Sequence, residues 1–139
     1  MRDQFLKTIE AVFTPKAPAP FGHYAQATRA GGLVHVSGQL PVVPGEKPDS
    51  HAPFEVQAKQ VIDNFLAILA AAGCGPQDVV KCTAYIVGSE NWPIYDRVFA
   101  AAFGEHKPAR TGLPVSGLHY GFLIEIDGVA LDPAAPAQT

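Results

Sequence analysis

Residues 54–72 read FEVQAKQVIDNFLAILAAA, and residues 79–87 read VVKCTAYIV. The first stretch predicts a long helix, because apolar residues recur at spacings of three and four at Val61, Phe65, Leu69 and Ala72. Gly73 and Gly75 end this pattern. The second stretch is rich in β-branched residues and alternates, which predicts a strand with one side made of Val80, Cys82, Ala84 and Ile86. A helix and a strand that each carry an apolar side predict a helix layer packed on a sheet.

Further elements are expected on both sides of this pair. Residues 91–103 predict a second helix with Pro93 in its first turn. Strands are expected at 24–29, 33–37, 109–115 and 122–131. The expected order is strand, strand, strand, helix, strand, helix, strand, strand, which is an α+β fold with a single sheet and two helices on one face. Residues 1–139 show no repeat and no second core, so one domain is expected, ending in a disordered tail at 133–139.

The composition favours a protein that works as an oligomer. Of the 139 residues, 47% are hydrophobic and 17% are charged, whereas an average globular domain has about 25% charged residues. The shortfall indicates that another subunit covers part of the surface. The formal net charge is −3, without a cluster of Lys and Arg, which argues against nucleic acid or an anionic membrane as the main partner. No apolar run is long enough to span a membrane, and Arg2, Asp3 and Lys7 do not fit a signal peptide, so a cytoplasmic location is expected.

The face of the sheet that the helices leave uncovered is expected to carry both polar and apolar side chains. The residues of the last strand that suit the core are Phe122, Ile124, Ile126 and Ala130. This alternation leaves Glu125 and Asp127 on the uncovered face. We assign Arg110 and Gly112 of the preceding strand, together with Ser37, to the same face. Clefts in an oligomer interface fit such a mixed face best, although from alternation alone a structural ion pair between Arg110 and Glu125 is the commoner arrangement.

The two cysteines do not indicate a metal or redox site. Cys74 and Cys82 have no metal-ligand spacing with histidine. Both are expected to be free thiols rather than a disulfide, metal ligands or a nucleophile. No phosphate-binding loop, dinucleotide fingerprint or nucleophile elbow is present in the sequence.

Several separated segments carry a resemblance to one known family. They are FGHYAQA at 21–27, VHVSGQLP at 34–41, QAKQ at 57–60 with Asn64, AAG at 71–73, DVVKCTAY at 78–85, FGEHKPAR at 103–110 and IEIDGVA at 124–130. Over about residues 19–131 the chain resembles the RidA/YjgF proteins, the reactive intermediate deaminases. The most specific signal is Pro-Ala-Arg followed some fifteen residues later by an Ile-Glu-Ile strand.

The resemblance implies a chorismate-mutase-like fold, assembled as a homotrimer with active sites in clefts between neighbouring subunits. It implies an enzyme similar to 2-iminobutanoate/2-iminopropanoate deaminases. Such enzymes hydrolyse reactive enamines and imines, such as 2-aminoacrylate and related imino acids, to 2-keto acids and ammonia. The resemblance implies no metal and no organic cofactor.

The same resemblance assigns the site residues. It places the arginine that binds the substrate carboxylate at Arg110, a task that suits a planar bidentate donor. It places at Glu125 the glutamate that positions or activates the attacking water. Tyr24 and the pair Ser37-Gly38 line the cleft, according to the same match.

The sequence departs from the family pattern at positions expected to line this cleft. Gly112 stands where the family has a cysteine, whose role runs largely through its backbone. Residues 111–120 and His23 also differ from the usual family residues. These departures bear on the identity of the substrate more than on the fold.

Three alternative functions stay open at this point. The same clefts could hold a small carboxylate without turnover, although a non-catalytic binder has less use for Glu125 facing an anion. The protein could be a specialised deaminase of a catabolic intermediate, such as an aminomuconate-like acid. Ribonuclease or translation-inhibitor activity, described for some members of the family, is disfavoured by the net charge of −3 and the lack of a basic face.

Overall fold

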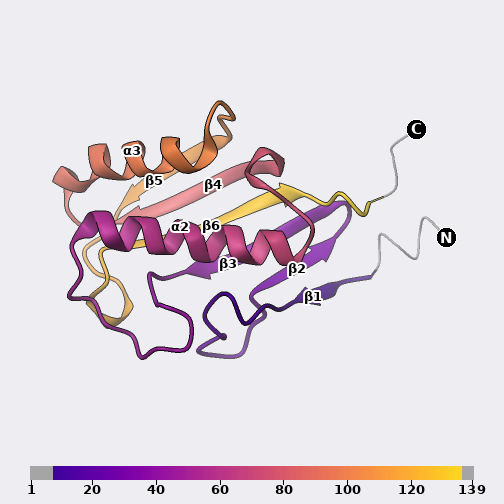
Figure 1. Cartoon of the computed structure of the whole chain (residues 1–139), viewed down its shortest axis with the longest axis horizontal. Coiled ribbons are helices and arrows are strands. Elements are labelled where there is room, and N and C mark those ends of the chain that lie inside the picture. The colour runs from indigo at the N-terminus through magenta and orange to yellow at the C-terminus, as the bar shows by residue number, and fades with distance from the viewer. Residues whose placement is uncertain (1–7, 136–139) are drawn as a thin grey trace.

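The computed structural model describes residues 8–135, which form a sheet of six strands with two long helices on one side of it (Figure 1). The strands are β1 (Glu10–Val12), β2 (Ala27–Ala30), β3 (Leu33–Gln39), β4 (Val79–Ile86), β5 (Ala109–Pro114) and β6 (Ile124–Leu131). The helices are α2 (Phe54–Ala71) and α3 (Trp92–Phe103), with 3-10 turns at Pro76–Asp78, Ser89–Asn91 and His119–Gly121. The strand order is β1-β2-β3-β6-β4-β5, with only β4 and β5 parallel among the described strands. The expected α+β class is confirmed.

The core lies between the helices and the sheet. The α2 residues with no exposed surface are Ala58, Val61, Ile62, Phe65, Ile68 and Leu69. Ile124, Ile126 and Ala130 of β6 are equally buried beneath them, as the alternation predicts. Full burial of each large apolar side chain stabilises the fold by about 1.5–3 kcal/mol. Phe65 reaches the sheet because position 128 is a glycine, where a β-carbon would lie 2.7 Å from Phe65 Cζ.

The start of β2 differs from the expected strand at 24–29. Gln26 is buried and uses its side chain to hold the preceding loop: Oε1 accepts from the Thr14 amide at 2.7 Å, and Nε2 donates to the Pro18 carbonyl at 2.9 Å. These bonds occupy the segment before Ala27, so the strand begins later. The short strand β1, for which the sequence provides no bounds, then pairs with β2.

One side of β4 is also not as expected. Val80 is 44% exposed, whereas Val79 is only 2% exposed. The pairing of β4 with β6 shifts register between Val79 and Lys81. Such an irregularity puts two consecutive residues out of strict alternation, so the predicted placement of Val80 in the core is wrong.

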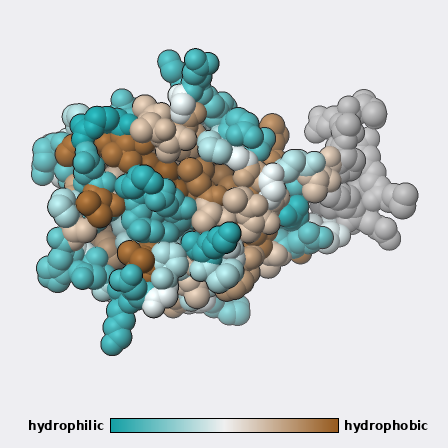
Figure 2. Space-filling view, viewed as in Figure 1, coloured by the Kyte–Doolittle hydropathy of each residue, from teal (hydrophilic) through white to brown (hydrophobic). Residues whose placement is uncertain are grey.

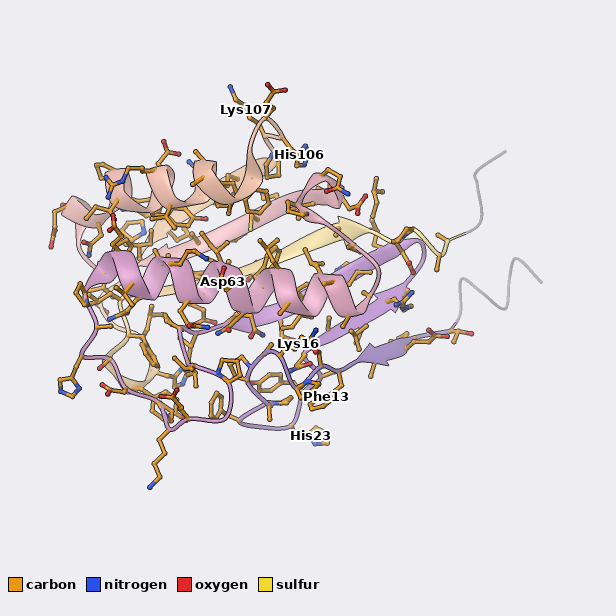
Figure 3. The ribbon with its side chains drawn as sticks, in the orientation of Figure 1. Phe13, Lys16, His23, Asp63, His106 and Lys107 are labelled. Atoms are coloured by element: carbon orange, nitrogen blue, oxygen red, sulfur yellow. The ribbon has the colours of Figure 1, made fainter. Side chains whose placement is uncertain are left out.

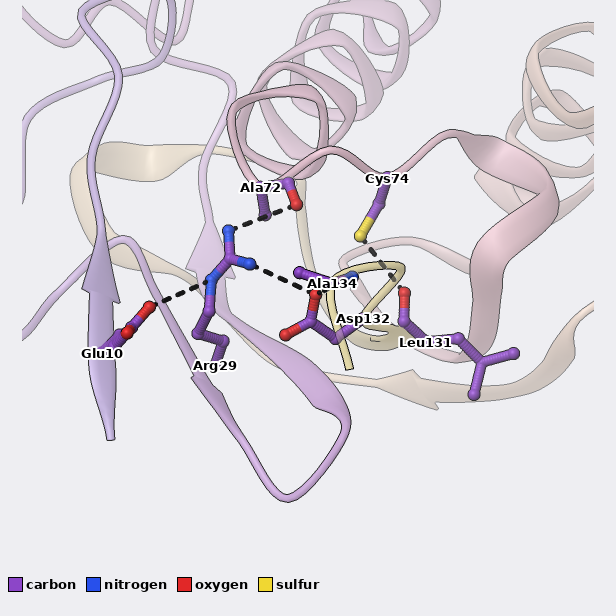
Figure 4. A network of polar contacts seen from close by, with 7 residues as sticks. All are labelled: Glu10, Arg29, Ala72, Cys74, Leu131, Asp132 and Ala134. Carbon is purple, nitrogen blue, oxygen red and sulfur yellow. Dashed lines mark hydrogen bonds and ion pairs between the residues drawn. The ribbon is translucent and has the colours of Figure 1, made fainter. Parts of the chain in front are cut away.

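A polar network joins the ends of several elements around Arg29 (Figure 4). Its guanidinium donates to Asp132 Oδ1 and to the Ala72 carbonyl, both at 3.2 Å, and lies 3.7 Å from Glu10 Oε2. The side chain of Asp132 is only 1% exposed. Because a buried carboxylate without a partner is strongly unfavourable, this network fixes the end of β6 against β1, β2 and the last turn of α2. Thr8, Glu10, Arg29 and Ala134 also line one small cavity there.

The end of the described chain continues from this network. The Ala134 amide donates to Asp132 Oδ1 at 2.9 Å, and the Ala135 amide donates to the Asp132 carbonyl at 3.1 Å. Residues 133–135 therefore form a turn, while the rest of the expected disordered tail, 136–139, lies outside the described residues. Residues 1–7, on which the expectation about a signal peptide rests, lie outside them as well.

The outer surface of the helix layer is mixed in character. Hydrophilic and hydrophobic residues are interspersed on the face that carries α2 and α3 (Figure 2). Asp63 lies on the exposed side of α2 (Figure 3), where its carboxylate pairs with Lys59 at 2.7 Å. Within residues 8–135, neither helix is long and apolar enough to cross a membrane.

Candidate functional site

A pocket of about 410 Å³ lies at the uncovered face of the sheet, beside the turn at His119–Gly121. It is lined by Phe21, Gly22, Tyr24, Ser37, Gly38, Leu40, His119, Tyr120 and Glu125. The structure therefore brings together four of the residues singled out from the sequence: Tyr24, Ser37, Gly38 and Glu125. Phe21, Leu40 and the His119-Tyr120 pair are additional lining residues. Phe21 and Leu40 lie in segments that carry the family resemblance, and His119 and Tyr120 lie in the 111–120 stretch that was expected to line the cleft.

An irregularity in β3 places Gly38 against Glu125. Val36 pairs with Gly128 and Gln39 pairs with Ile126, so β3 has one more residue than β6 between these two pairs. The extra residue makes a β-bulge at Ser37-Gly38, a device that redirects side chains next to functional sites. A β-carbon at position 38 would overlap Glu125 Oε2 and would lie 3.2 Å from Cδ. Glycine is therefore required there for the carboxylate to keep its position.

Ser37 holds the segment that carries Tyr24. Its hydroxyl donates to the Ala25 carbonyl at 2.7 Å, and its amide donates to the Gln26 carbonyl at 2.9 Å. The Tyr24 hydroxyl in turn accepts a hydrogen bond from the Phe21 amide at 3.1 Å. The hydroxyl proton of Ser37 is thus already used within the chain, which favours a positioning role for this residue.

Glu125 has the electrostatic surroundings of a proton acceptor. Burial raises the pKa of its carboxyl group above the ordinary value of 4.5, with the His119 charge opposing the rise and the Asp127 charge adding to it. Asp127 itself accepts a hydrogen bond from the Tyr85 hydroxyl at 2.9 Å. A half-buried carboxylate with a raised pKa at the wall of a pocket is suited to general base catalysis.

Arg110 lies on the other side of the sheet, which corrects the face assigned from the sequence. Arg110 of β5 is the pairing partner of Cys82 in β4, so the two side chains lie on the same side of the sheet. The Cys82 side chain is fully buried under the helices. The guanidinium lies over α3, 4.9 Å from the Phe99 ring centroid and 5.3 Å from that of Tyr95, and donates to Asp96 Oδ1 at 2.8 Å. Arg110 therefore does not pair with Glu125 within the chain, and the simple ion pair is also wrong. The Arg110 side chain keeps 34% of its surface exposed.

Gly112 shares that side with Arg110. It pairs with Ala84, and a β-carbon at position 112 would overlap the indole ring of Trp92 at the start of α3. Trp92 thus fills the space above the strand where the family pattern has a cysteine side chain. The sequence carries no signal for this contact, because no spacing rule connects Gly112 with Trp92.

The remaining chemical groups do not add to the site. Burial raises the pKa of the Cys74 thiol to about 11 and that of Cys82 to about 12. Both cysteines are free thiols, as expected, and both are buried. Among residues 8–135, no cluster of three or more His, Cys, Asp or Glu side chains is placed to hold a metal ion.

Comparisons with known proteins agree with this fold. The family described as Endoribonuclease L-PSP matches residues 14–132. A RutC family protein of Pyrococcus horikoshii is 40% identical over 121 residues, which are 87% of this chain and 96% of that protein. The 2-iminobutanoate/2-iminopropanoate deaminase of Escherichia coli K12 is 35% identical over 127 residues, covering 88% of this chain and 97% of the enzyme.

A solved structure gives the same result at the level of the backbone. The crystal structure of RidA from the Antarctic bacterium Psychrobacter superposes with a TM-score of 0.83 at 34% identity, covering 88% of this chain and 98% of that one. The sequence match and the superposition extend over nearly all of each chain. The protein therefore belongs to the RidA/YjgF family, the family also described as RutC or Endoribonuclease L-PSP.

Proposed function

We propose that this protein is a hydrolytic deaminase that converts enamine and imine intermediates, such as 2-aminoacrylate and related imino acids, to 2-keto acids and ammonia. The observation that carries the proposal is the position and charge state of Glu125. Its carboxylate lies over Gly38 at the wall of a pocket, and the pKa of this carboxyl group is raised. Membership of a family that includes imine deaminases supports the same chemistry.

The active site is formed by two chains of a homotrimer. Arg110 and Glu125 lie on opposite sides of the sheet, so one chain alone does not bring both to one substrate. All six residues of the edge strand β5 are exposed, and the Arg110 side chain keeps 34% of its surface exposed, so this edge of the sheet is accessible to a neighbour. In a closed ring of three, the β5 side of each chain faces the Glu125 pocket of the next.

The reaction begins when the enamine tautomerises to its imine. Arg110 binds the adjacent carboxylate with two parallel hydrogen bonds and fixes the imine carbon. A backbone carbonyl near Gly112 accepts a hydrogen bond from the imine N–H, which favours the protonated and more electrophilic form. Glu125 takes a proton from a water as its oxygen attacks the imine carbon. Glu125 then returns this proton to the nitrogen of the carbinolamine. The carbon–nitrogen bond breaks as Glu125 accepts the hydroxyl proton, so the keto group forms and ammonia leaves.

Substrate positioning by Arg110 and general base catalysis by Glu125 suffice to accelerate imine hydrolysis. General base catalysis contributes about 10²–10⁴-fold, and free imines hydrolyse readily without an enzyme. The mechanism uses no nucleophilic side chain, and both cysteines stay outside it.

An imine assay tests the proposal. An amino-acid oxidase or a dehydratase generates the imino acid in place, and formation of keto acid is followed with and without the protein. The wild type should accelerate hydrolysis, Glu125→Gln should lower kcat strongly, and Asp63→Asn, which removes a remote carboxylate on α2, should behave as the wild type. Equal activity of wild type and Glu125→Gln would contradict the catalytic assignment.

A mixing experiment tests the two-chain site. Arg110→Lys keeps the charge but loses the bidentate geometry, so kcat/KM should fall by roughly 30-fold or more. When Arg110→Lys and Glu125→Gln chains are refolded together in equal amounts, about one quarter of the sites regain both native side chains in a closed ring. Activity should return to that level. No recovery in mixed trimers, or a monomer mass by light scattering, would overturn the arrangement.

A further inference from the structure

The pocket beside Glu125 has two walls of different chemistry. Ser37, Gly38 and Glu125 form a polar wall, and Phe21, Tyr24 and Tyr120 form an aromatic wall. The volume of about 410 Å³ falls within the range of about 300–1,000 Å³ that is usual for small-molecule sites.

The aromatic wall is built by ring contacts. The Tyr120 ring lies 5.7 Å from that of Phe21 at 56° and 6.3 Å from that of Phe122 at 74°. Phe122 is 1% exposed and anchors the group, whereas Phe21 and Tyr120 are 50% and 53% exposed. Distances and tilts of this kind are favourable for aromatic pairs. A fixed aromatic surface is therefore presented to the pocket rather than to the core.

The backbone of Tyr120 points to the same role. Its φ is +61°, and it is the only residue other than glycine with a positive φ in the described part of the chain. A bulky side chain seldom adopts this conformation, in which glycine or asparagine is usual. Strained residues of this kind persist where the surrounding structure holds them, and they cluster at ligand sites. The neighbouring Gly121, with φ +78°, completes the tight bend that aims the ring.

We infer that Phe21 and Tyr120 bind the side chain of the substrate, and that the pocket prefers imino acids with an aromatic or large apolar side chain over 2-iminopropanoate. This inference rests on the proposed deaminase function for its catalytic consequence. The imine carbon lies beside Glu125, and the side chain of the substrate packs against the aromatic wall. A phenyl ring placed between them gains the contact with Tyr120 that a methyl group does not reach.

Two substitutions at one position separate the ring from the backbone. Tyr120→Gly removes the ring and adopts the observed φ without strain, while Tyr120→Phe keeps the ring as a matched control. The quantity to measure is the ratio of kcat/KM for the imine of phenylalanine to that for the imine of alanine. The ratio should exceed one in the wild type and in Tyr120→Phe, and it should fall by roughly 3- to 10-fold in Tyr120→Gly.

Binding of the product keto acids provides a readout that does not require turnover. Fluorescence of Trp92, the only tryptophan, or calorimetry should show tighter binding of phenylpyruvate than of pyruvate, and Tyr120→Gly should remove the difference. If neither imine is hydrolysed but this preference is seen, the deaminase proposal fails and the pocket assignment stands. If both imines are hydrolysed with a ratio of one or less, or with a ratio that Tyr120→Gly leaves unchanged, the pocket assignment fails. Loss of assembly in Tyr120→Gly at an unchanged ratio would likewise overturn it.

Discussion

The carboxylate of Glu125 lies directly over the α-carbon of Gly38, and the two residues come from neighbouring strands that pair through a β-bulge. The bulge gives the carboxylate its place, and the missing side chain at position 38 gives it room. Burial of the Glu125 carboxyl group is the main reason that its pKa is raised. The absence of a side chain at position 38 is what allows the carboxylate to lie where it does.

Replacement of Gly38 should therefore damage catalysis more than folding. In Gly38→Ala the new methyl group overlaps the Glu125 carboxylate and displaces it, and a displacement of about 1 Å can lower a rate by about 10²-fold. The cost in stability should be small, because the overlapping atoms are the end of a flexible side chain that can move aside. Steady-state kinetics and thermal melts measure both. Gly117→Ala is the control, because a β-carbon there meets nothing within 4 Å, and a similar loss of kcat in this variant would contradict the steric argument.

The contact between Gly112 and Trp92 should appear as an energetic coupling. Gly112→Ala, and equally Gly112→Cys with the usual family residue, should destabilise the protein by about 1–3 kcal/mol and shift the emission of Trp92. In a Trp92→Leu background the same changes should be nearly neutral. Chemical denaturation of the two single variants and the double variant gives the coupling free energy, expected at about 0.5–3 kcal/mol for residues in contact. Additive effects would show that the overlap is relieved without moving the indole.

The raised pKa of Glu125 predicts opposite effects of pH on stability and on rate. The folded protein holds this proton more tightly than the unfolded chain does. The contribution of Glu125 to stability is therefore complete below about pH 4.5 and is lost as pH rises through the folded pKa. The rate should instead rise over the same interval, because the base must be deprotonated.

Comparison with Glu125→Gln isolates this effect. The melting temperature of the wild type should fall relative to that of the variant as pH increases above 4.5. The acidic limb of the kcat/KM profile should have an apparent pKa above 4.5. A constant difference in melting temperature from pH 4 to pH 8 would show that the folded and unfolded pKa values are equal.

The cysteines should be chemically silent. With pKa values of about 11 and 12, Cys74 and Cys82 hold almost no thiolate at neutral pH, and both are buried. The folded protein should react with a thiol reagent at pH 8 only as it unfolds. Cys74→Ser with Cys82→Ala should keep nearly full activity and lose some stability at position 82. Rapid labelling of the native protein, or loss of activity in a variant that is still folded, would point to chemistry at these positions.

The helices and most strands follow from the sequence because local periodicity determines them. The helix expected at 54–72 is observed at Phe54–Ala71, and that expected at 91–103 is observed at Trp92–Phe103. The apolar side of β6 also agrees residue by residue with its burial. In each case one continuous apolar pattern packs against one core, so tertiary contacts reinforce the local preference.

The differences arise where a single long-range contact sets the outcome. The side of the sheet on which Arg110 lies depends on the register of a parallel edge strand, which the sequence of β5 alone does not determine. The late start of β2 follows from the side-chain bonds of Gln26. The pocket residues Phe21 and Tyr120 are 99 positions apart, and no spacing rule connects them. Family resemblance locates Tyr24, Ser37, Gly38 and Glu125, whereas the contact between Phe21 and Tyr120 emerges only from the folded chain.

The network around Arg29 brings the two ends of the described chain to one place, because Thr8 and Ala134 line the same small cavity. A circularly permuted protein is therefore feasible: a short linker would join these ends, and new termini would open at Gly45, which lies in an exposed loop with free space around it. Such a permutant would keep the sheet order while reversing which strands are made first. The connectivity of this architecture is then separable from its geometry.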